Sequence, residues 1–113
     1  MTIQKWSDDI VVAEMSDEPQ FTEEMTTLSE GLGDRPAHVV MNLGGMTYLN
    51  SSNISRLLRL RKQMLGANRR LILSAVNNQL WGVFLVTGLD KIFEFTKDVA
   101  TALATLQLSA GRK

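Results

Sequence analysis

The sequence has no cysteine, one histidine, one tyrosine and two prolines among its 113 residues. Without cysteine, disulfide bonds, thiolate zinc sites and cysteine nucleophiles are excluded, and a reducing compartment is a natural setting. The only histidine is His38, so any metal site would have to be built from carboxylates. We therefore expect neither a metal ion nor a cofactor.

An excess of charge and a long apolar run are also missing. Lys+Arg and Asp+Glu number 12 each, so no overall field points to nucleic acid or to a membrane surface. No apolar run approaches the roughly 20 residues of a membrane-spanning helix, and the first residues lack the layout of a signal peptide. We expect a soluble, cytoplasmic protein that binds no nucleic acid directly.

The apolar residues are sufficient for one compact core. They make up 44% of the chain, and the length suits a single domain over residues 1–113. We expect residues 1–8 and 109–113 to be frayed ends.

Short β-branched runs alternate with segments whose apolar residues have helical spacing. The runs predict strands over 10–15, 39–43, 70–76 and 92–95. The helical segments cover about 21–32, 51–65, 80–87 and 98–108. Gly31 and Gly33 are expected to end the first helix. The alternation predicts an α/β domain with a parallel or mixed sheet.

The stretch Asn50-Ser51-Ser52-Asn53 opens the second of these helices, after a buried strand and the turn Gly44-Gly45. A helix N-terminus offers free backbone N–H groups and the positive end of the helix dipole. It therefore suits an anion, or a side chain that becomes one on phosphorylation. The simpler interpretation is that Asn50 or Ser51 only caps the helix. From the residues alone both interpretations stay open.

Basic side chains follow this stretch along the same helix. They are Arg56, Arg59, Arg61 and Lys62, followed by Arg69 and Arg70. One interpretation is a solvated face whose long stems cover apolar surface. The other is a docking face for an acidic partner.

The remaining polar and aromatic residues give no catalytic constellation. We interpret His38 as structural, and Asp8-Asp9 and Glu23-Glu24 as solvated charges and helix-dipole partners. Trp81 and Phe84 are expected in the core, unless one of them is exposed as a partner anchor. An enzyme or small-ligand binder would need a deep pocket with converging polar groups, and no motif indicates one. We therefore predict no catalytic residues and no enzymatic activity.

The residues around this helix start resemble a known family. The chain reads Asn42-Leu-Gly-Gly-Met-Thr-Tyr-Leu-Asn-Ser-Ser-Asn-Ile-Ser55. This is similar to the STAS pattern: a strand, asp-leu-ser-x-val-x-phe-met/leu-asp-ser-ser-gly-leu-gly, then a leucine-rich helix. Further matching segments are 70–76, 87–90, 92–93 and 100–106. The resemblance to the STAS domain of anti-sigma factor antagonists thus spans about 39–106, while the N-terminal third matches poorly and its opening hairpin is expected to be shortened.

The resemblance implies a small STAS-like mixed β-sheet of about four strands, flanked by about four helices. It implies regulatory binding: an antagonist of this family binds an anti-sigma factor that is also a serine kinase. That kinase uses ATP to phosphorylate the first serine of asp-ser-ser-gly, which aligns with Ser51; Ser52 is the alternate acceptor. The predicted partner-binding residues are Asn50, Ser51, Ser52, Asn53, Arg56 and Arg59.

Two positions depart from the family pattern. Asn50 stands where aspartate is usual, which keeps the capping shape and loses the charge. Asn53 stands where glycine is usual, adding a side chain where a partner would closely approach bare backbone. These departures suit an alternative, a non-phosphorylated STAS scaffold in a stress-signalling complex or a STAS subunit of a lipid transporter. A homodimer is a further option.

Overall fold

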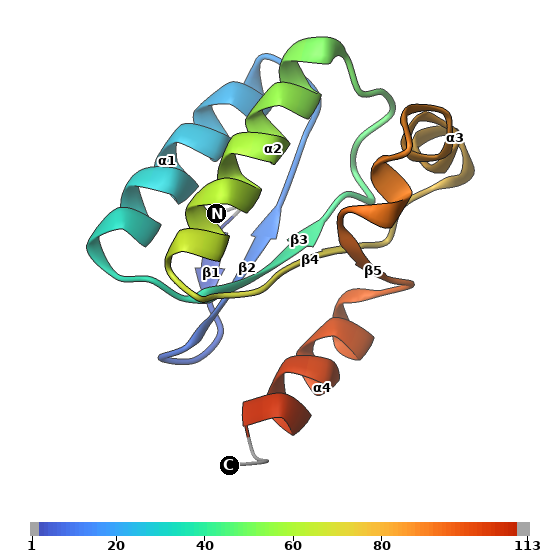
Figure 1. Cartoon of the computed structure of the whole chain (residues 1–113). Helices are drawn as coiled ribbons and strands as arrows, with labels where there is room; N and C mark the ends of the chain where they lie inside the picture. Colours follow the sequence, from blue (N-terminus) through green and yellow to red (C-terminus); the bar gives the residue numbers. More distant parts are fainter. Residues whose placement is uncertain (1–2, 111–113) are drawn as a thin grey trace.

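The computed structural model of the chain describes residues 3–110, and these build one mixed sheet (Figure 1). Its strand order is β1-β2-β3-β4-β5. The strands are β1 (Ile3–Lys5), β2 (Ile10–Glu14), β3 (His38–Asn42), β4 (Leu71–Ser74) and β5 (Glu94–Thr96). β1 pairs antiparallel with β2, and the other neighbours pair in parallel. The predicted α/β class and mixed sheet are confirmed, with five strands where about four were expected.

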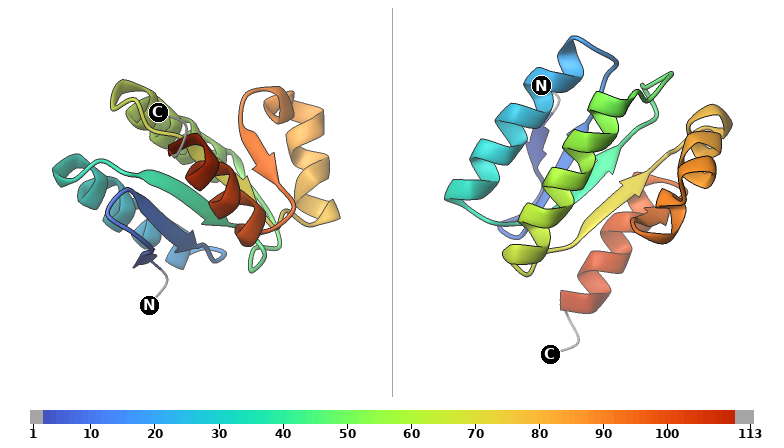
Figure 2. Two further views of the ribbon diagram at one scale, coloured as in Figure 1. Left: turned by 90° about the horizontal axis from the view of Figure 1, so that it is seen from below. Right: turned by 45° about the horizontal axis from the view of Figure 1, so that its top comes forward.

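Four α-helices flank the sheet in two layers (Figure 2). They are α1 (Gln20–Asp34), α2 (Ser51–Gly66), α3 (Asn78–Thr87) and α4 (Val99–Ala110), with a short 3₁₀ helix η1 (Leu89–Lys91) after α3. Within β3, Val39 and Met41 face the core shared with α1, α2 and α3, whereas Val40 faces α4. This alternation follows from the two-residue period of a strand, and both faces of the central strands are buried.

The first strand corrects the expectation that residues 1–8 are frayed. Ile3 pairs with Ala13 and Lys5 with Val11, so the opening hairpin is present with a strand of three residues. The pairing depends on contacts with residues six to ten positions away, which a short run with one apolar residue does not reveal. Ser109 and Ala110 also belong to α4 and are not a frayed tail. The same expectation for residues 1–2 and 111–113 lies outside the described residues.

Two further expectations about α1 are wrong. The helix continues through Gly31 and Gly33 to Asp34, and Leu28 and Leu32 are buried on its inner side. Their packing outweighs a cost of about 1 kcal/mol per glycine. Glu24 is 8% exposed and accepts hydrogen bonds from Ser16 N (2.9 Å) and Oγ (3.1 Å), so it is not a solvated charge.

Candidate functional site

The start of α2 is closed by two asparagines that cap each other. Asn50 is the N-cap residue, and its Oδ1 accepts the N–H of Asn53 at 2.8 Å. In return Asn53 Oδ1 accepts the N–H of Asn50 at 3.0 Å. This is a capping box in which asparagine takes the place of the usual Glu or Gln. The predicted cap is therefore confirmed at Asn50, and it fixes the backbone on which Ser51 and Ser52 lie.

The capping box is tied to α1 by one carboxylate. Asn53 Nδ2 donates to Glu18 Oε2 at 2.9 Å, and Glu18 Oε1 accepts from Thr22 N at 3.0 Å. Glu18 thus lies at the N-termini of α1 and α2 together, where the positive ends of both dipoles stabilise its charge. The sequence gives no sign of this pairing, because Glu18 and Asn53 are 35 residues apart.

The loop from β3 to α2 is held on both sides. On the α1 side, the carboxylate of Asp17 accepts from Thr47 N at 2.9 Å and from Thr47 Oγ1 at 2.6 Å. Partial burial alone would raise the pKa of Asp17, but these bonds and one from the Tyr48 N–H together lower it. On the α3 side, Asn77 Nδ2 donates to Met46 O at 3.0 Å.

Two glycines let this loop lie close to its neighbours. A Cβ on Gly44 would be 3.1 Å from Asn42 Oδ1, and one on Gly45 would be 3.2 Å from Met15 O. Both distances are tighter than ordinary van der Waals contact. The loop therefore fits against the ends of β2 and β3 only because these positions lack side chains.

Ser51 and Ser52 are exposed as the first two residues of α2. Among the described residues, neither hydroxyl takes part in a hydrogen bond to another side chain or to the backbone. Tyr48, just before the cap, is 41% exposed. The first turn therefore offers two free hydroxyls on a backbone that the capping box holds still.

The predicted arginines continue from this turn along the α1 side of the helix. Arg56 is half-buried and Arg59 is exposed, and both line a groove of about 300 Å³ between α1 and α2. Ser52 and Arg56 are one helical turn apart, so they lie on the same side of α2. Among the described residues neither arginine makes an ion pair, although Glu30 also lines the groove. The groove suits an acidic group of a partner.

Asn53 is a correction to the predicted partner-binding set. Its side chain is fully buried and bonded to Glu18, so it cannot contact a partner on this surface. The aromatic residues of α3 are in the core, as expected: Phe84 is fully buried, and Trp81 packs edge-on against Phe95 with ring centroids 5.0 Å apart. His38 is structural, since its Nδ1 accepts the N–H of Arg70 at 2.9 Å.

A family model described as the STAS domain matches residues 3–102 of the chain. The chain belongs to the STAS domain family. The match includes the N-terminal third, where the sequence pattern alone was weak. The capping box and the hydroxyls of Ser51 and Ser52 lie within the matched range.

Solved STAS structures have the same fold at low identity. One is an anti-sigma-factor antagonist (STAS) domain protein from Planctomyces limnophilus, with 20% identity, a TM-score of 0.78, and coverage of 93% of this chain and 97% of that one. Another is a substituted variant of RsbS from Moorella thermoacetica, with 15% identity, a TM-score of 0.78, and coverage of 97% and 99%. Within residues 3–110 of this STAS domain, no helix is long and apolar enough to cross a membrane.

Proposed function

We propose that this STAS domain is an anti-sigma factor antagonist, a non-catalytic regulator that binds an anti-sigma factor kinase through the start of α2. Asn50, Ser51, Ser52, Arg56 and Arg59 form its binding surface. The observation that carries the proposal is a pair of hydroxyls on a fixed first turn, beside a groove with two arginines; within residues 3–110 these hydroxyls have no hydrogen bond and these arginines no ion pair. The family membership supports it.

Ser51 is the regulated residue in this proposal. Phosphorylation adds nearly two negative charges and three acceptor oxygens. At the first helical position the dipole stabilises that charge, so the fold survives. A partner packed against the same turn would have to desolvate the phosphate, which weakens the complex. The switch therefore works without a large conformational change.

The test starts with intact mass, measured on protein from its native cells and after incubation with ATP and the anti-sigma kinases of the same organism. We expect a gain of one phosphate, mapped to Ser51 and lost in Ser51→Ala. A phosphate mapped to Ser52 in wild-type protein would instead identify Ser52, the alternate acceptor, as the modified residue. Binding to the kinase is then compared between wild type, Ser51→Asp and Gln107→Glu, which adds the same charge on α4 far from α2.

We expect Ser51→Asp to weaken kinase binding at least about tenfold, or 1.4 kcal/mol, and Gln107→Glu to leave it unchanged. Equal affinity of all three proteins would refute the phosphorylation switch. Whether the domain binds the kinase at all would be judged separately, from the measured affinity of the wild-type protein.

The contact between Asn53 and Glu18 favours a second candidate function. It places a carboxylate against the side chain of Asn53, two residues along the chain from Ser51, and this negative charge at the start of α2 would oppose a phosphate there. In that case the domain is a constitutive scaffold in a stress-signalling complex or a subunit of a lipid transporter. This candidate predicts a stable complex that co-purifies from native cells, carries no phosphate and is indifferent to ATP.

A further inference from the structure

A cleft of about 170 Å³ lies at the opposite end of α2 from Ser51. The helix has 16 residues, so the two ends are about 24 Å apart at 1.5 Å per residue. The cleft is lined by the last turns of α2, the start of β4 and the segment that leads into β5. The ionisable residues in its lining are Arg61, Arg69, Arg70 and Glu94, three positive charges against one negative.

Each of the three guanidinium groups is held by a neighbour. Arg70 pairs in a fork with Glu94, with Nε 3.0 Å from Oε1, and this pair raises the pKa of Arg70. Arg61 Nε donates to Ile92 O at 3.3 Å, and Arg69 Nη1 donates to Asn68 O at 3.4 Å. Two of the three positive charges in the cleft are therefore not balanced by a carboxylate of its lining.

Arg69 also carries a buried donor with nothing to bond. Its Nε is shielded from solvent and has no hydrogen-bond partner among the described residues. A buried donor left unsatisfied destabilises the protein, and the more so when it belongs to a charged group. An acceptor brought by a ligand would remove this destabilisation.

The C-terminal end of α2 carries the negative end of the helix dipole, and the arginines of the cleft offset it. Its last carbonyls are already engaged: Gln63 O accepts from Ala67 N at 3.1 Å, and Met64 O accepts from Arg69 N at 2.9 Å. The local field is positive enough to act on His38, beside the cleft. Burial has the largest effect and lowers the pKa of His38. The charges of Arg69 and Arg70 lower this pKa further, whereas those of Asp9 and Glu94 act to raise it.

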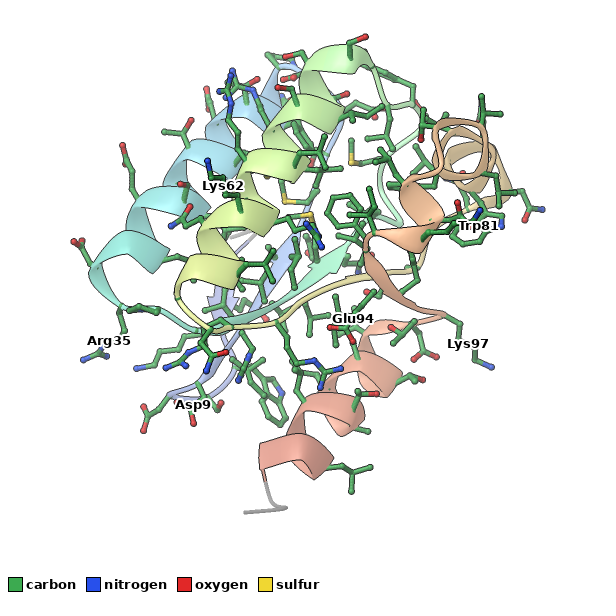
Figure 3. All side chains as sticks on the ribbon, viewed as in Figure 1. Asp9, Arg35, Lys62, Trp81, Glu94 and Lys97 are labelled. Atoms are coloured by element: carbon green, nitrogen blue, oxygen red, sulfur yellow. The ribbon has the colours of Figure 1, made fainter. Side chains whose placement is uncertain are left out.

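Apolar side chains are exposed in the lining of the same cleft. Leu65 is 60% exposed and Ile92 is 42% exposed. Glu94 is the first residue of β5, and Figure 3 shows Arg35 pointing away from the body of the molecule. The cleft thus combines fixed guanidinium groups with an apolar surface that nothing among the described residues covers.

We propose that this cleft binds a phosphate group carried on an apolar chain. Guanidinium groups match phosphate oxygens in a planar, bidentate geometry. The volume of about 170 Å³ suits one phosphate group, and the rest of the ligand would lie on the open surface beside it. Leu65 and Ile92 would contact the chain. The source of the phosphate is a phospholipid head group or a soluble phosphate monoester, and the site is independent of the function proposed for Ser51.

The first experiment titrates inorganic phosphate, and then hexyl phosphate, at constant pH and ionic strength. The signals followed are the arginine Nε–H groups and the ring C–H groups of the single histidine in NMR spectra. We expect saturable shifts for wild type and a rise in the pKa of His38 as the anion offsets the arginine charges. Arg69→Gln should weaken binding about tenfold or more, and Arg69→Lys should weaken it less, because it keeps the charge without the fork.

Arg35→Gln is the matched control, since it removes the same charge from an exposed position outside the cleft. It should bind within about twofold of wild type, a difference of less than 1 kcal/mol. Arg61→Gln serves as a second cleft variant should Arg69→Gln fail to fold. Shifts that do not saturate, or equal affinities for cleft and control variants, would overturn the proposal.

Vesicles distinguish the two sources. Co-sedimentation with phosphatidylcholine vesicles that contain phosphatidic acid, but not with phosphatidylcholine alone, and its loss in Leu65→Gln and Arg69→Gln, would support a lipid head group. Tighter binding of hexyl phosphate than of inorganic phosphate, without co-sedimentation, would support a soluble monoester. Binding of hexyl phosphate no tighter than inorganic phosphate, without co-sedimentation, would overturn the apolar chain in the proposal.

Discussion

The two ends of α2 differ in the side chains that surround them. At the N-terminal end, uncharged side chains satisfy the backbone: Asn50 and Asn53 cap each other, and the free groups are the hydroxyls of Ser51 and Ser52. At the C-terminal end the backbone caps itself through Ala67 and the residues that follow, and the side chains that remain are arginines. One helix therefore presents a capped first turn with two serine hydroxyls at one end and a positive, partly apolar cleft at the other.

The two ends also differ in how far apart in the sequence their residues lie. The capping box at the N-terminal end is made by residues within four positions of one another, so its geometry is local, and Glu18 ties it to α1. The C-terminal cleft brings together Arg61 of α2, Arg70 just before β4 and Glu94 of β5. The first surface should be sensitive to single cap substitutions, and the second to the charge that lines it.

The largest effect is expected from breaking the N-terminal cap at Asn53. Asn53→Ala removes the bonds to Asn50 N and Glu18 and empties a fully buried side-chain position. We expect a loss of about 2–3 kcal/mol in the free energy of unfolding, measured by urea denaturation. Asn78→Ala, at the exposed first position of α3, is the control and should change it by no more than about 0.5 kcal/mol. A cost for Asn53→Ala as small as that of the control would mean that the capping box contributes little.

At the C-terminal end the corresponding test is Asn68, which has φ +58° just after α2. Asn68→Ala should destabilise the domain by about 1 kcal/mol, because a Cβ disfavours this left-handed conformation and alanine lacks the local hydrogen bonding of asparagine. Asn68→Gly should be neutral or stabilise it by a few tenths of a kcal/mol. Thermal denaturation of the pair measures the difference. If alanine and glycine behaved alike, the backbone strain at this end would be negligible.

A smaller effect is expected from placing charge on the N-terminal end. Ser51→Asp should change the free energy of unfolding by less than about 1 kcal/mol, since the helix dipole favours the charge and Glu18 opposes it. The same substitution in a Glu18→Gln background should be more favourable than in wild type. A double-mutant cycle in urea measures this coupling, and a coupling near zero would show that Glu18 does not act on the acceptor position.

The smallest effect is expected from the pH dependence of the arginine end. The pKa of His38 is lowered in the folded state, so below its ordinary value of about 6.5 the unfolded chain binds more protons. The contribution of His38 to stability is therefore present above about pH 6.5 and decreases as the pH falls toward the lowered value. Denaturation across this range should show the slope in wild type and lose it in His38→Gln. A slope that persists in His38→Gln would assign it to other groups.

Local patterns in the sequence predicted the N-terminal end of α2 well. The strand before it, the start of the helix at Ser51 and the cap at Asn50 all follow from residue spacing and cap chemistry. The alternation of strands and helices also gave the class of fold. These features depend on neighbours in the chain, which a sequence displays directly.

Contacts between distant segments were not predictable in the same way. The burial of Asn53 depends on Glu18, and the burial of Glu24 depends on Ser16 in the preceding loop. The strand at Ile3–Lys5 exists because β2 is available to pair with it. The residues near these positions in the sequence do not indicate whether an acidic side chain is buried or solvated, or whether a short run pairs as a strand.

The loop between β3 and α2 has a consequence for the kinetics of binding. Its bonds from Thr47 to Asp17 and from Asn77 to Met46 restrict its motion before any partner arrives. The conformational entropy of this segment is therefore lost on folding and not on binding. A partner that docks on the first turn of α2 should bind as one rigid body to another, and affinity differences among surface variants should then appear mainly in how long the complex lasts.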